Sequence, residues 1–376
     1  MGSRSALNPP LASISAILRY VWRDLRLLML LGAFSLALAV WVRYGLGYPI
    51  PLEHLALTDR SRLILRYAFF LGPLILAAAL IRGWWIFRRS EGLLVGRSGG
   101  WLVALRSLRD RAFVFRIVLA AVTLLLMVAL FSVFALWKAS IPLISPWHWD
   151  PTLIGIERAF HGGVLPQELT RKWFGPGATV FLDRLYYLWF RLLALFIVWQ
   201  SFRAPSQSRT RTLLAVALVY TLLGNLAALL LSSGGPVYYS RLVGWPDPYA
   251  EQAAYLSAIP GLRATQVQDA IWRWLITDTY VPFGSISAMP SMHVAAVAVI
   301  ALACWDYHRL LGVAAWIYVI LILVGSVHLN WHYAIDGYAA ILGTLAVWWL
   351  SGLLVRRFRP GERPEATPQP RRCAPN

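Results

Sequence analysis

Charge is scarce in this sequence. Of its 376 residues, 14% are charged, whereas 59% are hydrophobic and 14% are aromatic, and the mean hydropathy is +0.59. Soluble globular chains carry about 25% charged and about 45–50% apolar residues. The balance found here excludes a soluble enzyme, a disordered protein and a coiled coil. It predicts an integral membrane protein that crosses the bilayer several times.

Acidic residues and cysteines are also few. There are 17 Asp and Glu against 35 Lys and Arg, which gives a net charge of +18. In a soluble protein this excess would suggest nucleic acid. In a membrane protein it marks cytoplasmic loops, so no nucleic-acid partner is predicted. The two cysteines exclude a disulfide framework, because Cys304 lies in an apolar run and Cys373 in a polar tail.

Apolar runs long enough to cross a bilayer recur along the chain. They predict an all-α integral membrane fold with about eight transmembrane helices. The runs cover residues 26–44, 63–87, 112–137, 177–200, 212–232, 289–305, 310–326 and 334–355.

Basic residues favour one side of these runs. The first side holds twenty basic and six acidic residues, in segments 1–26, 88–111, 201–211, 306–309 and 356–376. The other side holds nine basic and ten acidic residues, in segments 45–62, 138–176, 233–288 and 327–336. Because basic loops stay in the cytoplasm, both termini are predicted to be cytoplasmic. The composition favours a bacterial inner membrane.

Three regions follow from this organisation. Residues 1–111 form an N-terminal extension with two spans and a basic cytoplasmic loop. Residues 112–355 form a six-helix core, and residues 356–376 form a disordered basic tail. Two long outer segments, 138–176 and 233–288, are rich in Trp, Tyr and Pro and are predicted to cap the core.

Histidines gather at the outer helix ends. His332 and Asp336 are four residues apart, which places them on one helix face, one turn apart. A carboxylate that binds one ring nitrogen leaves the other free as a nucleophile or base. His293 follows Pro290 and Ser291 at the start of a span, where the free N–H groups of a first helical turn suit a phosphate. A histidine there can protonate a leaving oxygen.

These residues carry a family resemblance. Pro290-Ser291-Met292-His293 and His332-Tyr333-Ala334-Ile335-Asp336 resemble the Pro-Ser-x-His and His-x-x-x-Asp motifs of the type 2 phosphatidic acid phosphatase superfamily. Gly235-Pro236-Val237-Tyr238-Tyr239 resembles an upstream motif of the branch that includes the inositol phosphorylceramide synthases, the inositolphosphotransferase branch. The resemblance covers residues 112–355.

The resemblance implies a mechanism and its residues. His332 matches a nucleophile that forms a phosphohistidine, Asp336 its orienting carboxylate, and His293 the acid for the departing oxygen. No metal or other cofactor is implied. The substrate would be a lipid phosphate, and the acceptor would be water or a hydroxyl group. The oligomeric state is left open. The candidate substrate-binding residues are Ser291, Gly235, Pro236, Tyr238, Tyr239, His328, Arg184 and Arg191.

The cations that would neutralise the phosphate are not evident. The phosphatase branch has a Lys and an Arg-Pro in a first motif, which is not found, and an Arg where Ser326 stands. Arg184 and Arg191 are seven residues apart and share a helix face, so they are candidates for a phosphate clamp. The competing interpretation is a structural ion pair of Arg184 with Asp183.

Other functions compete with phosphoryl transfer. Hydrolysis would make the protein a lipid or polyprenyl-phosphate phosphatase. The spacing of His328, His332 and Asp336 would also suit a metal, which gives a metal-dependent membrane hydrolase as an alternative. Intramembrane arginines and broken helices would suit a lipid transporter.

Overall fold

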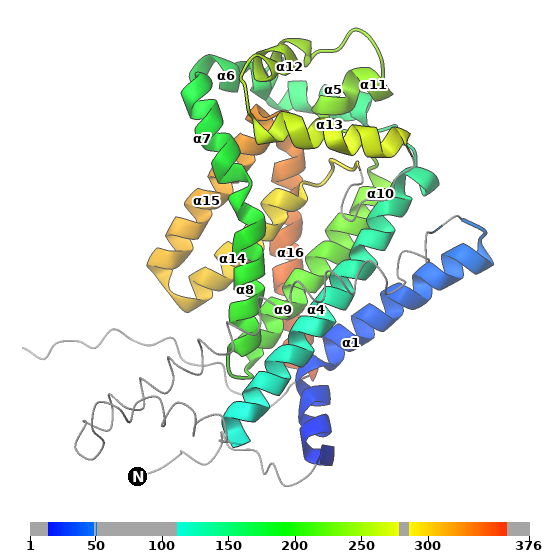
Figure 1. Cartoon of the computed structure of the whole chain (residues 1–376), viewed down its shortest axis with the longest axis vertical. Coiled ribbons are helices and arrows are strands. Elements are labelled where there is room, and N and C mark those ends of the chain that lie inside the picture. Colours follow the sequence, from blue (N-terminus) through cyan, green and yellow to red (C-terminus); the bar gives the residue numbers. More distant parts are fainter. Residues whose placement is uncertain (1–13, 49, 51–110, 278–285, 359–376) are drawn as a thin grey trace, which may run out of the picture.

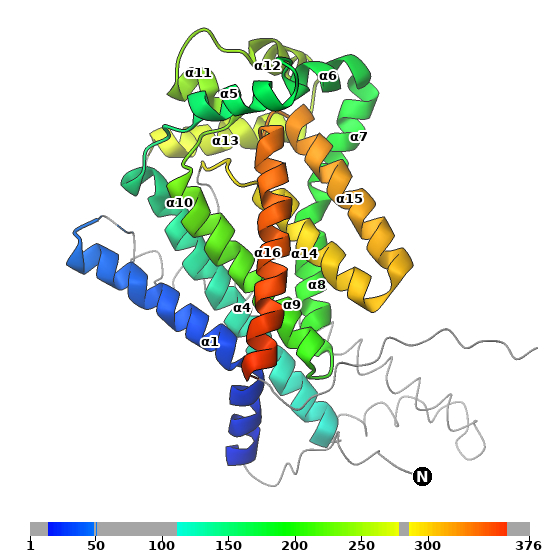
Figure 2. The same ribbon diagram turned by 180° about the vertical axis from the view of Figure 1, so that it is seen from behind.

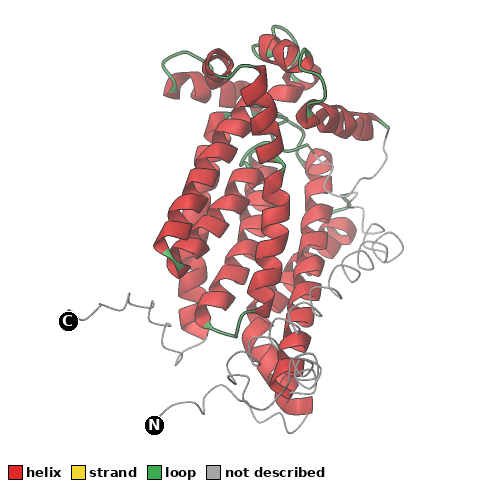
Figure 3. Ribbon diagram, turned by 60° about the vertical axis from the view of Figure 1, so that its left-hand side comes forward, coloured by secondary structure: helices red, strands yellow, loops and turns green. Residues whose placement is uncertain are grey.

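The computed structural model describes residues 14–48, 50, 111–277 and 286–358. These residues form helices and loops and no strand, as the sequence predicts (Figure 3). Long apolar helices make a bundle, and short helices cover one end of it (Figure 1). Within the described ranges, five helices are long and apolar enough to cross a membrane, which identifies an integral membrane protein.

The bundle is built around α14, which contacts α8, α9, η4, α15 and α16. Residues 294–299 of α14 are at most 1% exposed, and half of them are alanines whose small side chains let neighbouring helices approach closely. From behind, α16 runs down the middle of the bundle (Figure 2). The bundle elements are α1 (Ile14–Gly45), α4 (Arg111–Ile144), α8 (Leu188–Phe202), α9 (Gln207–Leu218), the π-helix η4 (Val219–Ala227), α10 (Ala228–Leu230), α14 (Met292–Tyr307), α15 (Arg309–His328) and α16 (Ala334–Phe358).

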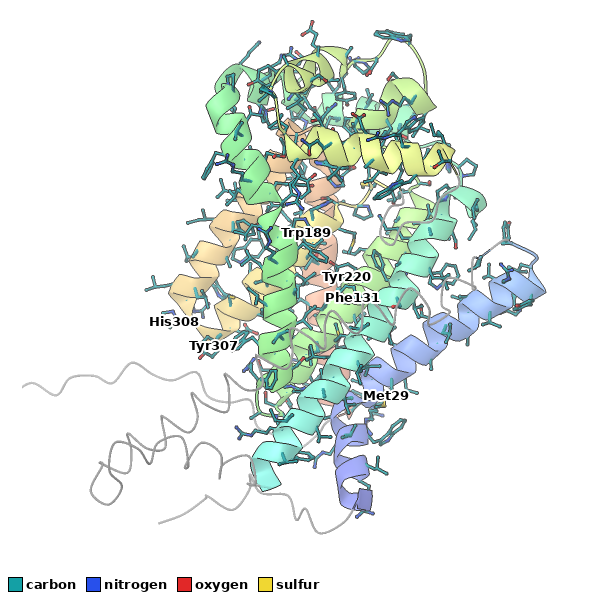
Figure 4. All side chains as sticks on the ribbon, viewed as in Figure 1. Met29, Phe131, Trp189, Tyr220, Tyr307 and His308 are labelled. Atoms are coloured by element: carbon teal, nitrogen blue, oxygen red, sulfur yellow. The ribbon has the colours of Figure 1, made fainter. Side chains whose placement is uncertain are left out.

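Aromatic rings fill the space between α4 and the η4 segment. Phe131 and Phe134 meet the ring of Tyr220 edge-on, with centroids 4.6 and 4.8 Å apart. Phe131 and Tyr220 are labelled in Figure 4. Such edge-to-face pairs add to the dispersion contacts that hold membrane helices together.

Most of the predicted spans coincide with helices of the structure, but some differ from them in length or continuity. Five of them coincide with the long apolar helices α1, α4, α9 to α10, α15 and α16, while α14 is a shorter apolar helix. The run 112–137 is too short as predicted, because α4 continues through Pro142 to Ile144. The run 177–200 is divided at Tyr187 into α7 (Pro176–Tyr186) and α8. The run 63–87 lies outside the described residues, so eight spans remain a prediction.

Short helices make up the covering layer, here called the cap. The segment 138–176 contributes α5 (Asp150–Phe160) and α6 (Pro166–Trp173). The segment 233–288 contributes η5 (Pro236–Tyr238), α11 (Tyr239–Leu242), α12 (Ala250–Ser257) and α13 (Arg263–Ile276). The cap helices lie together at the end of the bundle where α15 ends and α16 begins, with α13 beside α7 (Figures 1 and 2).

A buried carboxylate joins the cap to the bundle. Asp183 of α7 accepts the backbone N–H groups of Arg263 and Ala264, both at 2.9 Å. These are the first residues of α13, so Asp183 satisfies donors that a helix start leaves unpaired. The predicted ion pair with Arg184 is therefore wrong: Asp183 binds backbone, and Arg184 is exposed.

The opposite end of the bundle holds a buried ion pair. Arg209 of α9 and Asp24 of α1 contact one another, and both side chains are at most 1% exposed. Arg209 also donates to the Thr123 hydroxyl at 2.8 Å. At the same end, Arg26 of α1 donates to the carbonyl of Phe358. The described start of α1 and the end of α16 therefore meet at the end remote from the cap. Of the extension 1–111, α1 packs on α4 and α9, and residues 51–110 lie outside the described part, as do residues 359–376 of the tail.

Candidate active site

His332 and Asp336 meet where the loop 329–333 leads into α16. The Nδ1 atom of His332 is 3.2 Å from Oδ2 of Asp336, and both side chains are at most 5% exposed. The same carboxylate oxygen accepts the N–H group of Tyr333 at 3.1 Å. Asp336 lies in the first turn of α16 and binds back to the residue before that helix. The spacing of four residues therefore gives the one-turn contact that the sequence predicts.

His293 completes a line of three side chains. Its Nδ1 atom is 3.1 Å from Nε2 of His332, so the chain runs His293–His332–Asp336. His293 is the second residue of α14, and the hydroxyl of Ser291 caps that helix by accepting the N–H group of Val294 at 3.5 Å. The backbone N–H group of Ser291 donates to the carbonyl of Asp336 at 3.1 Å. His293 and His332, which are 39 residues apart in the sequence, thus lie side by side.

Burial controls the protonation of His332. Desolvation and, to a lesser extent, the charge of Lys138 lower the pKa of His332, a hydrogen bond with the backbone of Ala288 raises it, and the net result is a pKa of about 3. The imidazole is therefore neutral at physiological pH. Its Nδ1 proton is directed at the carboxylate of Asp336, so the lone pair resides on Nε2. That lone pair faces His293.

Aromatic rings surround His293. Tyr186 lies against its ring with centroids 4.9 Å apart, Trp189 meets it edge-on at 5.0 Å, and Trp331 lies at 6.3 Å. Trp189, from α8, is labelled in Figure 4. These rings keep the histidine pair in a low-dielectric environment, in which a fixed charge acts more strongly than in water.

Lys138 is a cation of the site that the sequence analysis missed. It lies in the last two turns of α4, is half-buried, and its Nζ donates to the carbonyl of Ser287 at 3.5 Å. Ser287 belongs to the segment that leads into α14, and the charge of Lys138 acts on the ring of His332. One signal could have found it. The sequence has two lysines, and Lys138 is the one that ends an apolar run.

The predicted arginine clamp is not formed. Arg184 on α7 and Arg191 on α8 are both exposed, whereas Tyr186 and Trp189 of the same two helices contact His293. The break at Tyr187 also removes the continuous helix on which a shared face was predicted. Aromatic residues, and not arginines, occupy the inner side of this pair of helices.

His328 is separate from the other two histidines of the site, His293 and His332. Its Nε2 atom is 2.8 Å from the Thr179 hydroxyl, and its ring packs against Phe174 at 5.2 Å and Tyr255 at 6.0 Å. The chain of contacts around His332 does not include it. In the described residues, no three His, Cys, Asp or Glu side chains are placed to hold a metal ion together. The metal-ligand spacing of His328, His332 and Asp336 is therefore not realised as a ligand set.

Gly235 packs directly behind the His332 loop. Its φ of +83° lies in the left-handed region, and a Cβ atom there would stand 3.0 Å from the carbonyl oxygen of Trp331. A side chain at this position would thus be strained and would press on the loop. The N–H groups of Gly234 and Gly235 donate to Asp150 of α5 at 2.8 and 2.9 Å.

The residues after Gly235 support the cap. Pro236 is buried at the start of η5, and the hydroxyl of Tyr238 donates to the carbonyl of Gln268 at 2.9 Å. Tyr239 packs near Tyr249, with centroids 6.1 Å apart. The structure thus places Gly235 of the predicted motif against the His332 loop, whereas Pro236, Tyr238 and Tyr239 pack within the cap.

Two acidic cap residues reach the His332 loop, and the sequence analysis missed both. Asp150 accepts the hydroxyl of Tyr333 at 2.7 Å. Glu157 accepts the N–H groups of Ala334 and Ile335 at 2.8 and 3.1 Å, so it caps α16. Burial raises the pKa of Glu157, and these N–H groups lower it in part. A scarce acidic residue in an apolar chain is the only sequence signal for either.

Fold and site together define a class: a membrane-embedded helical protein with a His–His–Asp line at one end of its bundle, in which His332 and Asp336 are buried and His293 is half-buried. The family model of the PAP2 superfamily matches residues 151–350, and the chain belongs to that superfamily. Comparison with curated proteins and with solved structures finds no match. Membership supports an enzyme of phosphatase or phosphotransferase type that acts on a lipid substrate in the bilayer.

Proposed function

We propose that this protein transfers a phosphoryl or phospho-head group from a lipid phosphate to a hydroxyl acceptor through a phosphohistidine on His332. One observation carries the proposal: His293, His332 and Asp336 form a continuous line of 3.1 and 3.2 Å contacts in a buried site. A neutral imidazole with its lone pair on Nε2 is the form that attacks phosphorus.

The first step forms one bond and breaks one. The Nε2 lone pair of His332 attacks phosphorus, and the bond from phosphorus to the lipid or head-group oxygen breaks. In this step His293 acts as the imidazolium: its ring turns from Nε2 of His332 to the leaving oxygen, gives that oxygen the Nδ1 proton and becomes a neutral imidazole. Asp336 stabilises the positive charge that develops on the imidazole of His332. The product is a phosphohistidine and an alcohol.

The second step reverses the roles. His293, now lacking that proton, takes one from the acceptor hydroxyl, whose oxygen attacks phosphorus while the bond to Nε2 breaks. The charge of Lys138 and the N–H groups at the start of α14 offset the negative charge of the phosphate. Ser291 shapes this start by capping the helix.

The substrate class follows from the place of the site. It lies where the apolar helices α14, α15 and α16 end beneath the cap, so a lipid head group reaches His332 while its chains stay among the helices. The motifs favour the inositol phosphorylceramide synthase-like branch, and with it transfer over hydrolysis.

We place the site on the extracytoplasmic side of a bacterial inner membrane, with both termini in the cytoplasm. Support comes from the excess of basic residues in the sequence segments predicted to be cytoplasmic. Of these segments, the described parts at the start of α1, the start of α9 and the end of α16 lie at the end remote from the cap. A cysteine at exposed cap position Trp245 should react with an impermeant maleimide on intact cells. Reaction only after lysis would reverse the orientation.

The decisive test uses purified protein in lipid–detergent micelles. A panel of phospholipids and polyprenyl phosphates is offered with and without inositol, sugars or ceramide, and mass spectrometry identifies the products. A new phosphodiester that depends on His332 and on an acceptor supports transfer. Free phosphate that depends on His332 makes the protein a phosphatase. Products that survive His332→Asn overturn the phosphohistidine.

A further inference from the structure

The loop that carries His332 is held by glutamines of the cap. Two backbone carbonyls of this loop, and the carbonyl of His328 at the end of α15, each accept a hydrogen bond from a glutamine amide. The three glutamines belong to three different cap helices, α6, α12 and α13. All three side chains are at most 5% exposed. The donors are Gln252 to His328 (2.5 Å), Gln268 to Leu329 (2.9 Å) and Gln167 to His332 (3.3 Å).

The next residues of the chain are held in the same manner. As described above, Glu157 binds the first two N–H groups of α16, and Asp150 binds the hydroxyl of Tyr333. The cap therefore contributes acceptors where the loop offers donors, and donors where it offers acceptors. These contacts reach residues 328, 329 and 332–335.

The loop has little regular structure of its own. Asn330 has a φ of 63°, in the left-handed region that few residues other than glycine adopt. Buried carbonyls need partners, and without the glutamines the carbonyls of residues 328 and 329 would be buried unpaired or would turn toward other donors. Either change would rotate the peptides next to His332.

We infer that the cap is a fixed positioning template for His332, and that Gln167, Gln252 and Gln268 are positioning residues of the reaction. The inference rests on the proposed function, since it assigns the cap a task in that chemistry. It opposes the idea that the cap opens as a lid over the site. A lid would have to break these buried hydrogen bonds in every cycle.

Single substitutions by methionine test the template. Gln268→Met and Gln167→Met keep the side-chain volume and remove the amide donor. We expect kcat to fall about 10- to 100-fold with KM within about twofold, because a misplaced nucleophile slows the chemical step. Gln266→Met is the matched control, because Gln266 lies on the same helix as Gln268 and is exposed. A kcat equal to that of the control in both variants overturns the inference.

Hydrogen exchange gives a second measurement that does not depend on activity. In the variants, amides of residues 326–336 should exchange faster while those of α14 stay protected. If the amides of a variant exchange faster throughout the chain, the variant has lost its fold. The test of the template then depends on the wild-type protein. In wild-type protein in lipid nanodiscs, the amides of α6, α12 and α13 should be protected from exchange for as long as the amides of the His332 loop. Cap amides that exchange as an independent unit, ahead of the loop, overturn the template.

The two failures are distinguishable. A wild-type protein without His332-dependent turnover would contradict the proposed function, and the exchange experiment would still decide whether the cap is fixed. A wild-type protein with turnover, unaffected by the glutamine variants, would leave the function standing and remove the template.

Discussion

The two ends of the bundle bury charge in different ways. At the end remote from the cap, Arg209 and Asp24 form a closed ion pair between α9 and α1. At the cap end, Asp150, Glu157 and Asp183 accept backbone N–H groups, and no Lys or Arg in the described ranges forms an ion pair with them. Charge at the first end fixes helices to one another. Charge at the second end shapes the loop that carries His332, the proposed nucleophile.

The largest effect is expected at the cap end. His332→Asn keeps a donor for Asp336 and removes the nucleophile, so kcat should fall about 10⁴-fold or more. Product formation by mass spectrometry measures it. The unfolding temperature of His332→Asn should stay closer to that of the wild-type protein than the unfolding temperature of Asp24→Asn, a variant at the opposite end. Activity within tenfold of wild type would contradict the role of His332.

Breaking the ion pair should affect stability and not chemistry. Asp24→Asn leaves Arg209 buried without its counter-charge, so the free energy of unfolding should fall by about 3–5 kcal/mol. Denaturation in detergent measures this loss, and kcat per folded molecule should be unchanged. The double variant Asp24→Leu with Arg209→Met should recover most of the stability. An unaltered unfolding midpoint in Asp24→Asn would argue against the contrast between the two ends.

Lys138 is the cation that the structure adds to the cap end, where it is half-buried and its charge acts on His332. Lys138→Met should raise KM about 10- to 100-fold, because a charge-assisted contact with phosphate contributes about 1.5–3 kcal/mol. Steady-state kinetics with the best lipid phosphate measures it. Lys172→Met is the control, because that lysine of α6 is exposed. Equal KM values in the two variants would exclude Lys138 from phosphate binding.

The low pKa of His332 predicts a pH dependence of stability. Burial lowers that pKa from an ordinary 6.5 to about 3. As the pH falls below 6.5, the unfolded chain binds a proton that the folded protein does not. The free energy of unfolding should therefore fall by about 1–2 kcal/mol between pH 7 and pH 5. His332→Asn should lack this part of the slope. Parallel curves for the two proteins would show that folding does not lower the pKa of His332.

The smallest effect concerns the arginine that the sequence suggested. Arg184 is exposed, so Arg184→Gln should leave KM and kcat within about twofold. The same lipid assay provides the measurement. A rise of KM as large as that of Lys138→Met would restore the arginine clamp.

Short-range patterns predicted more than long-range ones. Apolar runs gave most of the bundle, and a spacing of four residues gave the contact of His332 with Asp336. Periodicity placed Arg184 and Arg191 on one face but could not say which face is inward. That depended on Tyr186 and Trp189, which contact a histidine on α14, about a hundred residues away.

The three glutamines that hold the His332 loop could not be predicted from the sequence for a similar reason. Gln167, Gln252 and Gln268 bind carbonyls 165, 76 and 61 residues away. Backbone carbonyls are present at every residue, so no pattern of residue types marks the partner. Lys138 was hidden because it lay at the edge of a span and next to no other charged residue.

The capping of α16 by Glu157 has a consequence for biosynthesis. The cap residues that grip the His332 loop are made before the loop itself, because a chain is synthesised from its N-terminus. Until α15 and α16 are inserted, these buried polar side chains have only water as a partner. The cap and the His332 loop must therefore take their final form together, late in assembly. A chain stopped before α16 would present an unfinished cap to quality control.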